Sequence, residues 1–156
     1  MTLTILSVLL IAGCCTDECG YSYHGPTGDG NIQLVKKGKV KVLAPSSAEY
    51  AAVRKEVERL VATTYDFYRM VPGWRRLASQ GDEERAVVVN YKAPVSMAVP
   101  AWEVNLEVTG IYIPIGGSLL PSRVVFVFSA DSPSPSSLIV RGSKEPLLKL
   151  LEALMD

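Results

Sequence analysis

The sequence predicts an α+β domain in which a mainly antiparallel sheet of about five strands carries two helices on one face. Segments with apolar residues at every second position occur on both sides of the middle of the chain, which is typical of strands. Two other segments repeat apolar residues at helical spacing. The resulting order, β-β-α-β-β-β-(β)-α with a short bracketed strand, is typical of a sheet with helices on one side.

The first two predicted strands, residues 32–36 and 39–43, form a hairpin around Gly38. In the second strand Val40 and Val42 alternate with lysines, so we expect the valines to face the core and the lysines to face solvent. We interpret the lysine row as protection of a sheet edge against aggregation. The alternative is a surface for anionic lipid headgroups or a polyanionic envelope glycan.

A helix is predicted next, because Ser46 and Glu49 have the spacing of a capping box. Its apolar stripe is expected to pack on the sheet, and an ion pair between Arg54 and Glu58, one turn apart, adds a few tenths of a kcal/mol. The residues of the stripe are Tyr50, Val53, Val57, Leu60, Val61 and Thr64.

Residues 65–76, which follow this helix, are the most aromatic stretch of the chain. Their aromatic rings and guanidinium groups predict a ligand cleft for a sugar, a peptide or an anionic headgroup. The candidate cleft residues are Tyr65, Tyr68, Arg69, Trp74, Arg75 and Arg76. The competing interpretation, which we favour, is that these aromatic side chains cap the end of an ordinary core.

Four later segments complete the predicted sheet. Residues 85–92 are apolar on both faces and predict a central strand, whereas residues 102–109 alternate strictly and predict a half-exposed one. At Gly110 the alternation changes phase, which predicts a bulge. Residues 123–128 predict a buried strand and residues 138–140 a short one. The expected inward-facing side chains of the half-exposed strand are Trp102, Val104, Leu106 and Val108.

The last predicted element is a helix that follows Ser143. Pro146 lies in its first turn, where the missing N–H has no partner within the helix. Leucines between residues 147 and 154 cover more than one narrow stripe, and we expect most of them to dock on the sheet.

The beginning of the chain carries a different signal. Residues 3–11 are almost entirely apolar, but the stretch is too short to cross a bilayer core of about 30 Å. The small residues Ala12 and Gly13 follow, and then Cys14. This arrangement resembles a bacterial lipoprotein signal peptide with its lipobox.

The resemblance implies cleavage before Cys14 and attachment of a lipid to its thiol, so that the domain is anchored on the periplasmic or extracellular face of the cell envelope. Cys15 and Cys19 would then be free to form a disulfide. Two other interpretations stay open: a secretory signal that is cleaved without lipidation, and a buried segment of a protein that is not exported.

Residues 20–31 are rich in glycine and predict a flexible tether. The alternative is a ligand loop around Tyr21, Tyr23 and His24. The chain is therefore expected to divide into three parts, which are a signal peptide at 1–13, a lipid anchor and tether at 14–31, and a single domain at 32–156.

Catalytic patterns are weak in this sequence. His24 is the only histidine, and the chain lacks the sequence motifs of nucleotide-binding loops, serine hydrolases and zinc proteases. Glu103 and Glu107 would lie roughly 13 Å apart along one strand, which is too far for a glycosidase pair. We expect no metal and no cofactor.

The sequence therefore predicts a non-catalytic binding or structural module. Its expected partners are the membrane, through the lipid anchor, and another envelope protein or a polyanionic envelope glycan. A formal net charge of zero argues against a nucleic-acid partner. The alternative function is a small secreted or anchored hydrolase that uses acidic residues near the aromatic and arginine cleft.

Overall fold

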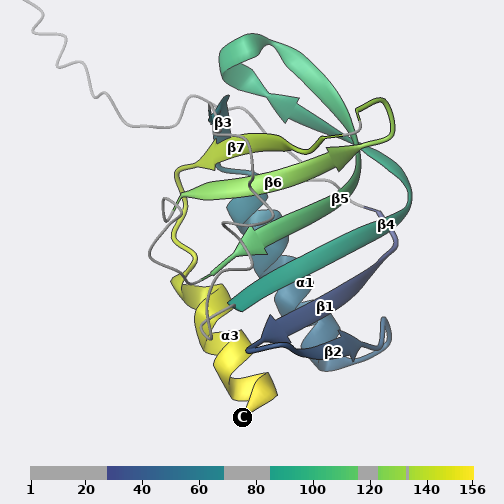
Figure 1. Cartoon of the computed structure of the whole chain (residues 1–156), viewed down its shortest axis with the longest axis vertical. Helices are drawn as coiled ribbons and strands as arrows, with labels where there is room; N and C mark the ends of the chain where they lie inside the picture. Colours follow the sequence, from purple (N-terminus) through teal and green to yellow (C-terminus); the bar gives the residue numbers. More distant parts are fainter. Residues whose placement is uncertain (1–27, 69–84, 116–122, 133) are drawn as a thin grey trace, which may run out of the picture.

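The computed structural model describes residues 28–68, 85–115, 123–132 and 134–156. In these residues one antiparallel sheet carries two helices on one face (Figure 1). Its seven strands lie in the order β2-β1-β4-β5-β6-β7-β3. The strands are β1 (Gly30–Lys36), β2 (Lys39–Leu43), β3 (Thr64–Phe67), β4 (Arg85–Val99), β5 (Val104–Pro114), β6 (Val124–Ser129) and β7 (Ser136–Val140). The helices are α1 (Ala48–Val61), α3 (Glu145–Met155) and the short 3-10 helix η1 (Pro100–Trp102). The predicted fold class is confirmed.

The sheet has seven strands rather than about five, and the unexpected one is β3. This strand of four residues directly follows α1 and pairs with β7 at one edge of the sheet. A bulge interrupts its register between Thr64 and Asp66, so its sequence shows no clear alternation. Thr64 was expected to continue the helical stripe, but α1 ends at Val61.

The predicted hairpin of β1 and β2 is confirmed, and its turn residues Lys37 and Gly38 have the positive φ angles, 50° and 74°, of a type I′ turn. The predicted facing of β2 is wrong. Val40 and Val42 are 58% and 60% exposed, whereas Lys41 donates a hydrogen bond to the Leu154 carbonyl in the last turn of α3. A lysine is stabilised there because the carbonyls that end a helix carry partial negative charge.

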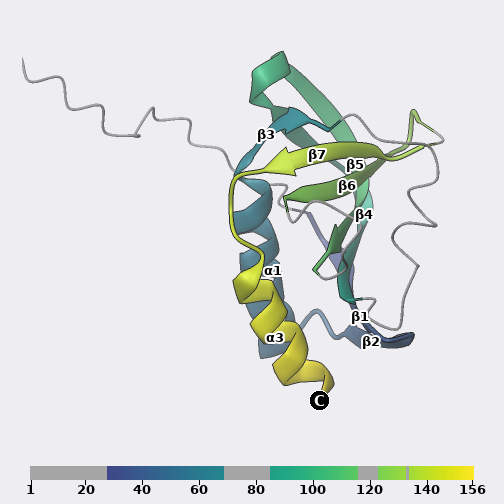
Figure 2. The same ribbon diagram turned by 60° about the vertical axis from the view of Figure 1, so that its left-hand side comes forward.

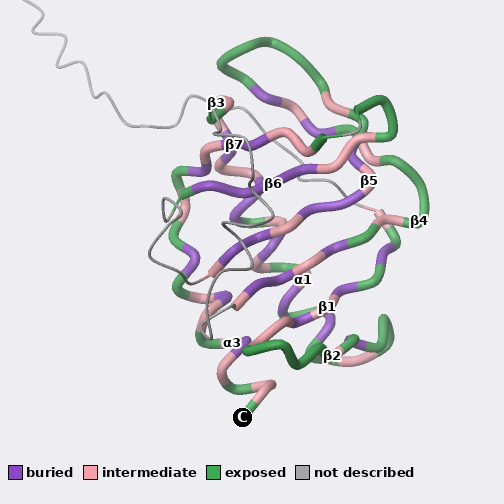
Figure 3. The backbone as a smooth tube through the Cα atoms, in the orientation of Figure 1, coloured by how far each residue is buried: buried purple, intermediate pink, exposed green. Residues whose placement is uncertain are grey.

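Both helices lie side by side on the same face of the sheet (Figure 2). The expected stripe of α1 is buried from Tyr50 to Val61, and the Arg54–Glu58 ion pair is present at 2.8 Å. The N-cap is Ser47 and not Ser46, because the Ser47 hydroxyl accepts the N–H of Tyr50 at 3.0 Å. In Figure 3 the buried segments run through the centre of the sheet and along α1, which places the main core between the two layers.

Charged side chains also hold the C-terminal half of α3 against the sheet. Glu152 lies 2.6 Å from Lys36 of β1 and 2.8 Å from Arg85 of β4, and Lys36 also contacts Asp156. The contact between Glu152 and Arg85 is an ion pair without aligned hydrogen-bond geometry.

Among the described residues, no helix has both the length and the apolar character of a membrane-spanning segment.

The strand β6 is buried on both faces. Val125 and Val127 belong to the core beneath the helices. Because successive side chains of a strand alternate between faces, Val124 and Phe126 lie on the opposite side, where both are at most 1% exposed.

A buried lysine joins the ends of β5 and β6. Lys144 is 9% exposed, and its ammonium donates hydrogen bonds of 2.7 Å to the carbonyls of Pro114 and Val124. Burial lowers the pKa of Lys144 from its ordinary value of 10.5 to about 8. The residue therefore ties the start of α3 to two neighbouring strands.

The long hairpin of β4 and β5 bends over one end of the domain. Its register shifts between Asn90 and Val95, and the pairing of β5 with β6 shifts at Gly110, as predicted. Beyond these irregularities the hairpin arches until η1 contacts β3 (Figure 1). Trp102 and Val104, expected to face inward, are 60% and 40% exposed because they lie at this tip.

Candidate functional site: the β3 groove

An open groove of about 500 Å³ lies where the end of α1, the start of β3 and η1 meet. We call it the β3 groove. Its lining residues are Ala62, Thr63, Thr64, Tyr65, Pro100, Ala101 and Arg141. Most of the groove wall is apolar, and Arg141 is the charged residue among those that line it.

Hydrogen bonds hold Thr63, one of the lining residues, in one position. The Thr63 hydroxyl donates to the Leu60 carbonyl at 2.5 Å and accepts the N–H of Gly142 at 2.8 Å. The Thr63 carbonyl accepts the N–H of Arg141 at 3.0 Å. A Cβ atom on Gly142 would lie only 2.9 Å from the Thr63 hydroxyl, so this close approach requires glycine. The end of α1 and the backbone of Arg141 are therefore fixed relative to each other.

Arg141 is the charged group of the groove. Its guanidinium carbon lies 4.4 Å from the centre of the Tyr65 ring, in a cation–π arrangement. Arg141 is exposed and takes part in none of the ion pairs among the described residues. A guanidinium that lies over an aromatic ring can still donate N–H groups to a carboxylate or a phosphate.

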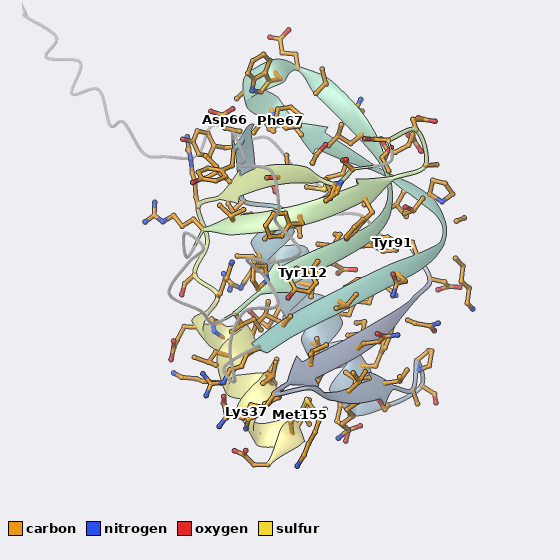
Figure 4. All side chains as sticks on the ribbon, in the orientation of Figure 1. Lys37, Asp66, Phe67, Tyr91, Tyr112 and Met155 are labelled. Atoms are coloured by element: carbon orange, nitrogen blue, oxygen red, sulfur yellow. The ribbon has the colours of Figure 1, made fainter. Side chains whose placement is uncertain are left out.

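The other end of the β3 edge is closed by the tip of the β4–β5 hairpin. One carboxylate oxygen of Asp66 accepts both the N–H of Phe67 and the indole N–H of Trp102, each at 2.7 Å. The Trp102 ring packs edge-on against Phe67 with 5.9 Å between ring centres. Figure 4 shows Asp66 and Phe67 side by side at this end of the domain. These contacts occupy the outer edge of β3 beyond Tyr65.

Thr64 contributes a buried hydroxyl with no hydrogen-bond partner. The residue is 5% exposed, and its hydroxyl oxygen is buried without a donor or acceptor. Such a group loses its hydrogen bonds to water on folding and receives nothing in return. The unpaired hydroxyl of Thr64 therefore lowers the stability of the folded protein at the wall of the groove.

We therefore expect Thr64→Val to raise the free energy of unfolding by about 1 kcal/mol, because valine has nearly the same shape and removes the unpaired hydroxyl. The matched control is Thr63→Val, which removes two hydrogen bonds and should lower the free energy of unfolding by about 1 to 2 kcal/mol. Urea denaturation of both variants measures the two changes. A loss of stability in Thr64→Val would contradict this assignment.

The structure brings together only part of the predicted cleft. Tyr65 lines the groove, and Tyr68 lies at the end of β3 with its N–H bonded to the Ser137 carbonyl. The other predicted residues, Arg69, Trp74, Arg75 and Arg76, lie outside the described residues, as do Cys14, Cys15, Cys19 and His24.

Sequence reasoning missed Arg141 and the residues of η1. Arg141 comes seventy-six positions after Tyr65 and reaches it only because β7 pairs with β3. The available signal was an arginine followed by glycine at the end of a short predicted strand, and it identifies no partner.

In the part of the chain that the structure describes, no group of three histidine, cysteine or acidic side chains could hold a metal ion. Of the two glutamates expected on one strand, Glu103 ends η1 with a φ of 52°, outside β5, and both are exposed. Comparison of this chain with protein families, with curated proteins and with solved structures finds no match.

Proposed function

We propose that this chain is a lipid-anchored, non-catalytic binding module of the cell envelope that holds an anionic group in the β3 groove. In this proposal Cys14 carries the lipid, and the residues between Cys14 and β1 connect it to the domain. The predicted end of the tether at residue 31 is too late, because β1 already begins at Gly30 and pairs with β4. The domain meets its ligand at the periplasmic or extracellular face. The ligand group belongs to another envelope protein or to a polyanionic envelope glycan.

One observation carries the binding half of the proposal. Arg141 lies over the Tyr65 ring at the wall of a groove, and it is exposed and outside every ion pair of the described residues. The nearby carboxylate of Asp66 is engaged by Phe67 and Trp102. An arrangement with a preformed cation, apolar walls and an engaged carboxylate favours holding an anion over acid–base chemistry.

The anchoring half of the proposal is supported by the leader. An apolar stretch at residues 3–11, the small pair Ala12 and Gly13, and then Cys14 have the order that a lipoprotein signal requires. A single acyl chain gives only marginal membrane binding, whereas two chains on one residue hold a protein stably. The proposal therefore requires a diacylated Cys14.

We expect Cys14→Ser to move the protein from the membrane fraction to the soluble fraction, because the serine hydroxyl cannot receive the thioether-linked lipid. Membrane fractionation and mass spectrometry of the mature N-terminus measure this. The wild-type chain should begin at Cys14 and carry diacylglycerol. Cys15→Ser is the matched control, and it should stay on the membrane. An unmodified N-terminus at Met1, or a Cys14→Ser variant that stays on the membrane, would contradict the proposal.

A further inference from the structure

The backbone of Thr64 is the part of the β3 edge that lines the β3 groove, although the residue as a whole is only 5% exposed. Next to the first pair of the β3–β7 ladder, the Thr63 carbonyl accepts the N–H of Arg141, while the Thr63 N–H donates to the Leu60 carbonyl in α1. That first pair, Thr64 and Val140, is then a pair without mutual hydrogen bonds. This agrees with the N–H of Val140, which points away from β3 and donates to the Arg123 carbonyl, next to β6.

It follows from this register that the N–H and C=O of Thr64 point away from β7. Farther along this edge the N–H of Phe67 is already bonded to Asp66, and Trp102 packs against the same place. Strand addition at the edge is therefore limited to the backbone of Thr64. A continuous added strand needs a longer ladder, whereas a chain end can combine a short backbone pairing with the capture of its carboxylate.

The groove at Thr64 has the other features that a chain end requires. Ala62, Pro100 and Ala101 give it apolar walls that leave room for small side chains. Arg141 stands at the same groove and can donate its N–H groups to a carboxylate. The open backbone pair and the free guanidinium are independent features, and both suit one ligand.

We propose that the β3 groove binds the free C-terminal end of an extended peptide, which pairs with the backbone of Thr64 and places its carboxylate on Arg141. This inference deepens the proposed function and rests on it, since it names the anionic group as the terminal carboxylate of a protein partner. The hydroxyl of Thr64, which has no partner in the free protein, lies within the same wall.

The probe is N-acetyl-tetraalanine, used once with a free carboxylate and once as its C-terminal amide. The protein is the full chain with Cys14→Ser, and amide NMR signals are followed during titration. We expect the acid to shift the signals of Thr64, Tyr65 and Arg141 and to slow hydrogen exchange of the Thr64 N–H. The amide should bind at least tenfold more weakly, because the charge-assisted hydrogen bonds to Arg141 are lost.

Arg141→Gln should remove the preference for the acid, since it removes the charge that the carboxylate meets. Arg123→Gln is the matched control, because Arg123 is also exposed and lies outside the groove. Its acid preference should equal that of the parent chain.

Equal binding of acid and amide, or an unprotected Thr64 N–H in the complex, would overturn the peptide inference. Polygalacturonate is the second probe. If it shifts the groove signals and the peptide acid does not, the peptide inference fails and the proposed anion site stands. If neither probe shifts the groove signals, the groove is not the binding site and both proposals fail.

Discussion

Replacing Phe126 by alanine is expected to lower the free energy of unfolding by about 3 to 5 kcal/mol, the range typical of a fully buried phenylalanine. Phe126 is 0% exposed and lies in the central part of the sheet, on the face opposite the helices. Its ring packs against Tyr112 of β5, with 6.1 Å between ring centres. The expected loss therefore measures how tightly the Phe126 side chain is packed on this face.

The matched control is Phe128→Ala on the same strand and the same face. Phe128 is only partly buried, so its truncation removes less buried apolar surface and leaves a smaller cavity. Urea denaturation of both variants should show a clearly larger loss for Phe126. Equal losses would mean that the outer face is no better packed at its centre than at its edge.

The second large effect is a rise in stability between about pH 8 and pH 10.5. Lys144 has a pKa of about 8 in the folded protein because burial disfavours its charged form, against an ordinary value of 10.5. Below pH 8 the lysine is protonated in both states, and the cost of burying its charge is fully present. Between the two pKa values the unfolded chain binds more protons than the folded one, so the free energy of unfolding increases with pH.

A difference of about 2.5 between the two pKa values corresponds to roughly 3 kcal/mol. Thermal denaturation or urea titration from pH 7 to pH 10.5 measures the rise. Lys144→Met is the control, because methionine has a similar length and no charge, and its stability curve should lack this rise. The same slope in both proteins would show that another group is responsible.

Lys36 titrates in a different range. Hydrogen bonds to Asp156 and Glu152 raise the pKa of Lys36 above 10.5. Stability from that lysine is present below pH 10.5 and is lost only above it. The rise in stability assigned to Lys144 therefore lies below pH 10.5, and the loss of stability assigned to Lys36 lies above it. The two effects can be measured separately.

Periodicity in the sequence predicted the elements with long repeats. The stripe of α1, the hairpin around Gly38 and the phase change at Gly110 all depend on local spacing, and the structure has each of them. The strand β3 could not be predicted in this way, because four residues with a bulge carry no period.

The wrong face of a strand was predicted to be buried where an element far away in the sequence determines which face packs. Alternation in β2 correctly predicts two faces but does not say which one the core takes. The carbonyls at the end of α3 attract Lys41, and Val40 is left exposed as a result. For the same reason the groove was only half predicted, since Tyr65 lies in an aromatic stretch while Arg141 reaches it through strand pairing.

The strand order has a consequence for the synthesis of this protein. β2 and β3 are the two borders of the sheet, and α1 alone carries the chain from one border to the other. Everything between β1 and β3 is filled by β4 to β7, which the ribosome makes later. The first 67 residues can therefore form a hairpin and a helix but no continuous sheet. We expect the domain to fold only after residue 140 has emerged, and a chain cut between β3 and β4 to leave neither part with a complete core.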